Sequence, residues 1–567
     1  MALLSLDLLV IFSCAAVGLL IWARTRSRNR PPHPPGPPGL PIVGNLLDIP
    51  SPNAFPWDTY MEYGKEYDSD IIRLNALGMN IIVANSIQVA TELLDRRSAI
   101  YSDRPRMVML GELSGFGTGM AFVPYNSFWK DCRKLARQEF HANPVKKYRP
   151  TEVKSAHRFL LDLHRRPDSL MDNLRHLAGA TIMAIGYDIE VQPEDDPYVQ
   201  TAEEAVASIA ETTNAGSYLV DVLPILKHVP EWFPGAGFKK QARIWHAAVD
   251  KLFNDPYTVC QERIAVGQLG ECAAKGMIEA FGKHPDDPEY THTVIKSTLG
   301  SLYVGGADTT VSALGTFFLA MTLNHELVEK AQRQLDQVVG AHRLPDFRDQ
   351  ASLPYIEAIV RETLRWRPVV PLDVPHRLTE DDIYNGYYLP KGSLIVANAW
   401  YVTSRLLNLR ILRCFALPAF SAHLRWLAGV QPIMSLAYAH CRRRLHRAIL
   451  HDEKMYPDPE RYNPDRFLLP DGTLNPAVRD PTTVAFGFGR RICPGRYMAV
   501  DSMWVTIACV LSLFDIRKAV DQDGKEITPD GEYIRGFLCH PKPFPCSIKP
   551  RSKEHEQLLN ELAQHDL

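Results

Sequence analysis

Residues Phe486–Arg496 read FGFGRRICPGR and hold the strongest functional signal of the chain. Glycines at positions 487, 489 and 495 allow a tight backbone turn with unusual φ values around a single cysteine. A thiolate held in such a loop can bind iron, and the cation Arg491 can pair with a carboxylate of a cofactor. The competing interpretation is a glycine-rich loop around a buried structural cysteine, which is the commoner use of this residue. The spacing favours Cys493 as a metal ligand.

This stretch resembles the haem-binding signature FxxGxRxCxG of the cytochrome P450 family. The match falls on Phe486, Gly489, Arg491, Cys493 and Gly495. The resemblance implies a mainly α, α+β body that holds haem b, with Cys493 as the axial ligand of the iron and the other four residues around the cofactor.

Two further segments match motifs of this family. Glu362 and Arg365 fit the ExxR motif, in which an i,i+3 spacing puts an acid and a base on one helix face. In isolation such a pair is most often an ordinary helical ion pair. Pro464–Phe467, with the sequence PDRF, resembles the family's PERF segment. The resemblance implies that Arg466 joins Glu362 and Arg365 in a buried network that supports the haem loop.

Three more residues correspond to contacts of the haem propionates. Trp129 and Arg133 resemble the family's WxxxR pair, and His376 in the sequence PHR matches another propionate contact. For His376 the alternative is a surface residue at the end of a strand.

Residues 291–323 form a long, mostly apolar stretch that predicts a buried helix. Gly305-Gly306 and Asp308-Thr309-Thr310 interrupt it, which predicts a helix weakened at its middle. The segment resembles the oxygen-activation motif of the P450 distal helix, where a helical bulge admits O2 and water. The resemblance makes Asp308 and Thr309 the catalytic acid and alcohol, which deliver protons to the oxygen. Outside this context a mid-helix Asp-Thr is usually a solvated face or a kink.

The N-terminus predicts a membrane anchor at residues 1–23. Leu8–Ala23 is almost purely apolar and uncharged, and arginines follow at 24, 26, 28 and 30. Because positive residues stay cytoplasmic, we expect a single-pass anchor in the endoplasmic reticulum membrane with the catalytic domain in the cytoplasm. A cleaved signal peptide would carry its charge before the apolar run. Residues 24–45 form a basic and proline-rich hinge.

Residues 46–567 are expected to form the haem domain. Apolar residues make up 46% and charged residues 23% of the chain, which excludes wholesale disorder. The formal net charge of -2 gives no reason to expect a nucleic-acid partner. Ten cysteines without a CxxC pair favour a reducing compartment. Short β-type runs are expected at Ile71–Leu74 and Asn80–Ala84.

Residues 401–447 interrupt the family pattern with a foreign composition. They contain eight arginines and no lysine, aspartate or glutamate. We interpret them as a retained intron translated in frame, because Trp-Tyr-Val at 400–402 can encode the donor GTATGT. Excision would join Trp400 to Ala448 and restore the family pattern. The rival interpretation is a real basic amphipathic loop that touches the membrane or a partner.

The resemblance implies a monooxygenase that inserts one atom of O2 into a lipophilic small molecule. The nearest likeness is to fungal secondary-metabolism or xenobiotic P450s similar to O-methylsterigmatocystin oxidoreductase, carried by phrases such as Phe347-Arg348-Asp349. The substrate itself is not readable, since it depends on segments after Tyr101, around 208–222 and near 369–374. The alternatives are a P450-fold enzyme without oxygenase activity, or a haem protein impaired by the insert.

No reductase domain is fused to the chain, so the electrons of NADPH must come through a separate partner. The resemblance implies NADPH-cytochrome P450 reductase, with cytochrome b5 as a second donor. The candidate docking residues are Lys130, Arg133, Lys134 and Arg496. Each of them is otherwise an ordinary solvated charge.

Overall fold

The computed structural model describes residues 30–50, 55–213, 217–281, 287–400, 449–534 and 536–565. The predicted anchor at 1–23 and the predicted insert at 401–447 lie outside these ranges.

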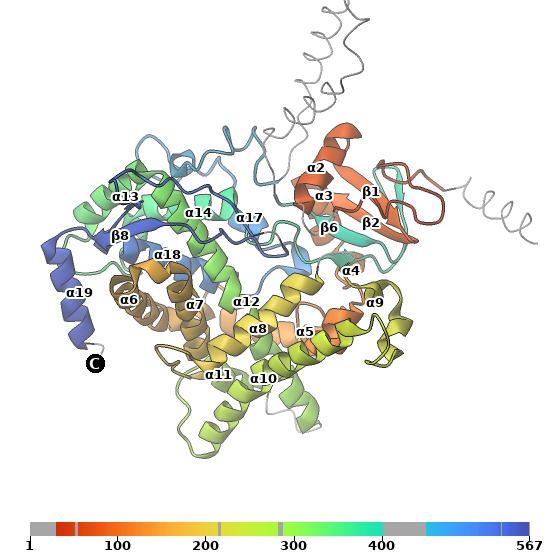
Figure 1. Ribbon diagram of the computed structural model, residues 1–567, viewed down its shortest axis with the longest axis horizontal. Helices are drawn as coiled ribbons and strands as arrows, with labels where there is room; N and C mark the ends of the chain where they lie inside the picture. The colour runs from red at the N-terminus through yellow and green to blue at the C-terminus, as the bar shows by residue number, and fades with distance from the viewer. Residues whose placement is uncertain are drawn as a thin grey trace, which may run out of the picture.

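Helices make up most of the described chain (Figure 1). The long ones are α2 (Pro56–Glu66), α5 (Ser127–Phe140), α6 (Arg149–Arg165), α7 (Leu170–Tyr187), α8 (Pro197–Thr212), α10 (Gly237–Ala265), α11 (Ala273–Phe281), α12 (Pro288–Leu323), α13 (His325–Val338), α14 (Pro354–Trp366), α18 (Arg496–Leu513) and α19 (Lys553–His565). Four-residue helices are α3 (Ile87–Ala90), α4 (Ser98–Tyr101), α9 (Leu219–Val222) and α17 (Thr482–Ala485).

The main sheet has the strand order β1-β2-β6-β3 and lies at one end of the molecule (Figure 1). Its strands are β1 (Ile71–Ala76), β2 (Met79–Ala84), β6 (Leu394–Ala397) and β3 (His376–Arg377). Two small antiparallel sheets pair β4 (Asp382–Tyr384) with β5 (Tyr387–Leu389), and β7 (Phe514–Lys518) with β8 (Cys546–Pro550). Both predicted β-type runs are confirmed as β1 and β2, and the mainly α, α+β class is confirmed.

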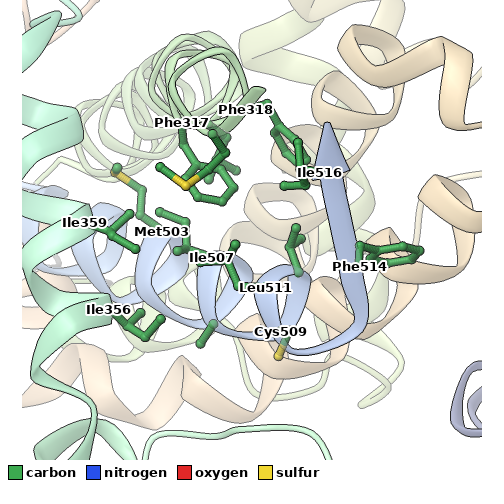
Figure 2. Packing of buried hydrophobic residues seen from close by; sticks show 14 of the residues in the cluster. Phe317, Phe318, Ile356, Ile359, Met503, Ile507, Cys509, Leu511, Phe514 and Ile516 are labelled. Carbon is green, nitrogen blue, oxygen red and sulfur yellow. The ribbon is translucent and has the colours of Figure 1, made fainter. Parts of the chain in front are cut away.

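Helix α18 is the centre of the largest core cluster. Figure 2 shows its side chains packed against α12 and α14, through Phe317, Phe318, Ile356, Ile359, Met503 and Ile507. Each such side chain contributes on the order of 1.5–3 kcal/mol on burial. The helix begins three residues after Cys493, so this core supplies a rigid base for the cysteine loop.

Among the described residues, α18 alone is long and apolar enough to cross a membrane without a bend, and 72% of it is buried inside the protein. A second candidate is the bent pair of α12 and α13, which meet at 104°. Core helices pass the same test of length and composition, so neither tests the predicted anchor.

The predicted buried helix is confirmed as α12, which is a continuous α-helix from Pro288 to Leu323, so the bulge that the resemblance implied at its middle is wrong. The tertiary contacts override the weak helix propensity of Gly305-Gly306. A side chain at Gly306 would sit 3.3 Å from Ile182 of α7, so this glycine permits close helix packing. The two glycines do mark a distinct part of the helix, because residues 304–310 are less buried than the helical turns before and after them.

Candidate functional site

Cys493 lies in a backbone turn between α17 and α18. Its N–H donates to the carbonyl of Phe486 at 2.9 Å, which closes the loop around the cysteine. Gly487 and Gly489 have φ values of +77° and +55°, which side-chain-bearing residues rarely adopt. A Cβ on Gly489 would lie 2.1 Å from the carbonyl oxygen of Leu94, so no other residue fits there.

Gly495 does not have the unusual φ value that was predicted for the glycines of this loop. Its φ is −82°, an ordinary value, and a Cβ there would lie 4.0 Å from Sγ of Cys493. The absence of a side chain therefore keeps the space beside the sulfur free.

The surroundings of the sulfur act on its ionisation in opposite directions, with burial as the largest effect. Burial raises the pKa of the Cys493 thiol, while a hydrogen bond from the backbone of Gly495 and the cations Arg133 and Arg496 lower it. A metal ion bound in place of the proton would remove the cost of burial, because coordination deprotonates a thiol outright.

A cavity of about 310 Å³ lies beside this loop. Cys493 lines it together with Gly305, Gly306 and Thr309 of α12. Most of the remaining lining is apolar and rich in aromatic rings, among them Phe116, Phe122, Phe140, Phe253, Phe486, Phe488 and Phe537. An apolar cavity with few polar groups is the usual form of a small-molecule site.

Three arginines, Arg104, Arg133 and Arg491, also line this cavity. Burial and, after it, the charge of the neighbouring Arg104 lower the pKa of Arg491 to about 8. Burial likewise lowers the pKa values of Arg104 and Arg133 to about 10. Such depressed values mark positive charge that the described residues only partly neutralise.

The side-chain hydrogen bonds of these cations involve no carboxylate among the described residues. Arg491 donates to three backbone carbonyls and to no carboxylate, and Arg133 has no hydrogen bond within the described ranges. His376 is buried with Nδ1 against the carbonyl of Tyr101, and its Nε2 has no partner among the described residues. Its burial excludes the surface alternative and lowers its pKa well below the usual value.

These residues fit a cofactor with a thiolate-bound metal and carboxylate side arms, as haem has. Trp129 adds a ring under Arg491, with the guanidinium carbon 4.4 Å from the ring centroid. The predicted propionate contacts Trp129, Arg133 and Arg491 therefore line one cavity with Cys493. His376 lies next to the Arg104 and Arg491 charges, although it does not itself line the cavity.

Glu362, Arg365 and Arg466 meet in one buried network. Both carboxylate oxygens of Glu362 accept hydrogen bonds from Arg365, at 2.7 and 2.8 Å, and both side chains are fully buried. Arg466 approaches the same carboxylate at 3.2 Å. Arg365 also donates to the carbonyls of Leu450 and Pro459, so the network fixes the chain that leads to the cysteine loop.

Asp308 and Thr309 point to different sides of α12. Thr309 lines the cavity, and its hydroxyl donates to the carbonyl of Gly305 at 2.5 Å. Asp308 is not part of the lining, and its carboxylate lies 3.0 Å from Nε2 of His540. The structure therefore brings Thr309, but not Asp308, to the cavity.

Sequence reasoning missed Arg104, which is 4% exposed and donates to the carbonyls of Val374, Pro375 and Ala121. It also missed the cavity residues Phe537 and Leu538. The phrase SDRP at 102–105 is an ordinary charge pair before a proline, and it gave no signal for Arg104. All three segments expected to set specificity contribute to the lining, for example through Ile209 and Val369.

Comparison with protein families gives one match, to the family described as Cytochrome P450. It covers residues 34–405 and 445–547 and leaves out 406–444.

The chain is also similar to fungal proteins over nearly its whole length. Cytochrome P450 monooxygenase 98 of Postia placenta is 41% identical over 98% of this chain and 97% of its own. Cytochrome P450 monooxygenase ple1 of Rhodocybe pseudopiperita is 39% identical over 96% of this chain and 94% of its own. Tryptamine 4-monooxygenase of Psilocybe cyanescens is 34% identical over 96% of this chain and 98% of its own.

Proposed function

Because the chain belongs to the cytochrome P450 family, we propose that it inserts one atom of O2 into a neutral, lipophilic small molecule and reduces the other to water. The proposal rests on one observation. A single apolar cavity is lined by Cys493, by Thr309 and by three arginines whose side chains form no hydrogen bond with a carboxylate of the described residues. The first test is the absorption spectrum of the reduced, CO-bound protein, in which a red-shifted Soret band reports thiolate ligation. Turnover that requires both NADPH and reductase separates a monooxygenase from a P450-fold isomerase or dehydratase.

The cofactor proposed is haem b, which supplies oxygen activation, with the thiolate donating electron density to favour O–O cleavage. Cys493 would ligate the iron, while Arg104, Arg133 and Arg491 would neutralise the propionates. The apolar walls exclude water and so strengthen each of these electrostatic contacts.

Proton delivery is the chemical task of α12. The overall reaction consumes two protons with two electrons and one O2. The Thr309 hydroxyl is placed to hold a proton at Oγ1 inside the cavity, and Asp308 is the acid that replenishes it from the outer side of the helix.

Replacing Thr309 with alanine is expected to lower product formation about 10²-fold, the lower end of what general acid catalysis supplies. NADPH oxidation continues, because electron transfer does not need the hydroxyl, and hydrogen peroxide accumulates instead of product. Thr310→Ala is the matched control, since Thr310 follows Thr309 in the sequence and lines the same cavity. Equal coupling in Thr309→Ala and wild type, or equal loss in both variants, contradicts the assignment.

The substrate proposed is uncharged. Among the described lining residues Asp373 is the only acid, and it lies beside Arg104, with its carboxylate accepting from the N–H of Val374. The hydroxyls of Ser301 and Thr181 donate to carbonyls of their own helices. Oδ2 of Asp373 has no hydrogen-bond partner among the described residues, but the charge of Arg104 beside it opposes an ammonium group, so a protonated amine like tryptamine is disfavoured here.

The proposed electron donor is NADPH-cytochrome P450 reductase, with cytochrome b5 as a second donor. Lys130, Lys134 and Arg490 are exposed, and Lys130 and Arg490 both lie against the ring of Tyr125 near the cysteine loop. These three cations form the docking surface that we propose. Arg133 belongs to the cavity lining instead, and Arg496 is bound to the carbonyl of Cys493.

Two exposed apolar groups support association with the endoplasmic reticulum membrane. One comprises Leu40, Ile42, Leu47 and Leu77, and the other Leu219, Leu223, Ile225, Trp232 and Phe233. Figure 1 places β1–β2 and α9 on the same side of the molecule. Apolar and aromatic residues of this kind suit a bilayer interface, and residues 1–23 would add a single-pass anchor that leaves the catalytic domain cytoplasmic.

The two chain ends that flank residues 401–448 lie next to each other. The N–H of Leu450 donates to the carbonyl of Ala399 at 3.4 Å, and the ring of Trp400 lies 6.3 Å from that of His451. If 401–447 were removed, Leu450 would stand four residues after Ala399, and this bond would become that of one helical turn. This geometry supports our proposal that the functional enzyme lacks the insert.

Deleting 401–447 is expected to leave the fold intact and to raise the yield of protein with the red-shifted CO band at least about threefold. The chain between Glu362 and Arg466 shortens from 104 residues to 57, which lowers the cost of loop closure by about 0.5 kcal/mol. That cost is small, so a larger effect must come from the composition of the insert. A glycine-serine linker of the same length is the control. A strong band from the full chain and none from the deletion variant would contradict the proposal. A strong band from the deletion variant and none from the full chain would show that the full chain is the impaired form.

A further inference from the structure

A polar face of α12 is bound by the loop that precedes β8. Asp308, Ser312 and Thr316 follow one another at four-residue intervals, so they share one side of the helix. The carboxylate of Asp308 pairs with His540, the hydroxyl of Ser312 donates to the carbonyl of Cys539 at 2.6 Å, and Thr316 accepts from Tyr533 at 3.1 Å.

The loop that carries His540 is held at other points as well. The N–H of Cys539 donates to the carbonyl of Val369 at 3.0 Å, and the N–H of Ile534 donates to the carbonyl of His540 at 2.7 Å. Phe537 and Leu538 of the same loop line the cavity. The imidazole is therefore placed by backbone contacts that do not depend on Asp308.

Asp308 lies on the solvent side of α12. Its side chain is 26% exposed and that of His540 is 15% exposed. Glu203 of α8 interacts electrostatically with Asp308, and it is 3.7 Å from Arg175 of α7. A line of ionisable groups thus runs from the surface to the residue that precedes Thr309.

The direction of the His540 hydrogen bond follows from chemistry. An ionised carboxylate only accepts, so Nε2 of His540 must carry the proton and donate it to Asp308. Neighbouring residues on a helix project about 100° apart, so Asp308 can face His540 while Thr309 faces the cavity.

We propose that His540 is a positioning residue, which holds the Asp308 carboxylate at the solvent end of a proton path that leads to the Thr309 hydroxyl. This inference rests on the proposed monooxygenase function. Two protons enter along this path in each turnover, matched by the two electrons from NADPH, and both leave in the one water that is formed. The hydroxyl hydrogen of the product is the one taken from the substrate C–H bond. Without His540 the carboxylate can turn toward bulk water, and the path loses its fixed start.

The test compares His540→Leu with His540→Gln in the form of the chain, with or without residues 401–447, that gives the red-shifted CO band. It is assayed in microsomes with reductase, NADPH and the neutral probe 7-ethoxycoumarin. Hydrogen peroxide, water and product are measured per NADPH oxidised. His540→Leu is expected to lower the sum of product and water about tenfold, a fraction of the effect of general acid catalysis. Gln places an amide N–H near the position of Nε2, and it is expected to restore coupling to within about twofold of wild type.

Two further measurements separate positioning from a general effect on structure. Hydrogen peroxide used in place of NADPH and O2 brings its own protons, so the defect of His540→Leu is expected to shrink to about twofold or less. Ser312→Ala removes a contact with the same loop without touching Asp308, and it is expected to couple like wild type. The CO-bound spectrum should be the same in all variants.

The outcomes distinguish the inference from the function on which it rests. If Asp308→Asn and Thr309→Ala keep wild-type coupling, the proposed proton path itself fails. If those two variants uncouple while His540→Leu does not, or if Ser312→Ala uncouples as strongly as His540→Leu, the role of His540 is overturned and the path stands.

Discussion

Replacing Cys493 with serine is expected to abolish the red-shifted Soret band of the reduced, CO-bound protein and to lower monooxygenation more than about 10³-fold. Serine keeps the shape of the residue and its N–H bond to the carbonyl of Phe486, so the loop should persist. What is lost is the thiolate, the donor that pushes electron density onto the metal. The measurements are the difference spectrum and the rate of NADPH-dependent product formation.

Cys132→Ser is the control for this experiment. Cys132 is buried in α5, where its sulfur lies 3.7 Å from the carbonyl of Val294, and it does not line the cavity. Its replacement should cost some stability and leave the spectrum unchanged. A red-shifted band in Cys493→Ser, or its loss in Cys132→Ser alone, would refute the assignment of the ligand.

Replacing Glu362 with alanine is the second change for which a large effect is expected. It leaves the guanidinium groups of Arg365 and Arg466 in the interior without a counter-charge. Removing one partner of such a pair costs about 3–5 kcal/mol, which is a large part of the stability of a typical domain. Arg365 also holds the carbonyls of Leu450 and Pro459, so the segment leading to the cysteine loop would lose its anchor. We expect little or no haem-containing protein, measured as the absorbance at the Soret band per milligram of purified chain.

The same helix provides a matched control. Glu357 and Arg361 of α14 form an i,i+4 ion pair at 3.0 Å, with both side chains partly exposed. Glu357→Ala should cost much less, on the order of 1 kcal/mol, because Arg361 keeps Asp480 at 3.2 Å as a counter-charge. If Glu362→Ala kept normal haem content and thermal stability, or if Glu357→Ala were equally damaging, the special role of the buried network would be wrong.

Local motifs made the cysteine loop and the Glu362–Arg365 pair predictable. Each is set by residues within eleven positions of one another, and the chemistry of a metal ligand or an ion pair limits which residues can serve. Arg104 shows where this reasoning ends. Its burial depends on the carbonyls of Val374 and Pro375, about 270 positions away, and no local pattern encodes that meeting.

Helix α12 shows the opposite error, in which a local signal was given too much weight. The glycines at 305 and 306 weaken an isolated helix, but packing against α7 keeps α12 continuous. The orientation of Asp308 was also beyond the sequence, since its partner His540 lies 232 positions away. The substrate is harder still to read, because segments distant in the sequence each contribute a part of the cavity wall.

The cavity wall and the cysteine loop obey different constraints, and this difference bears on how such enzymes diverge. Gly489 is fixed by the backbone of Leu94, whereas cavity residues such as Ile209, Val369 and Leu538 are defined only by the space they fill. Mutations in the wall can therefore accumulate without loss of the metal ligand. The substrate that the enzyme accepts can therefore change through mutations in the cavity wall. The oxidative chemistry stays the same as long as selection preserves the cysteine loop.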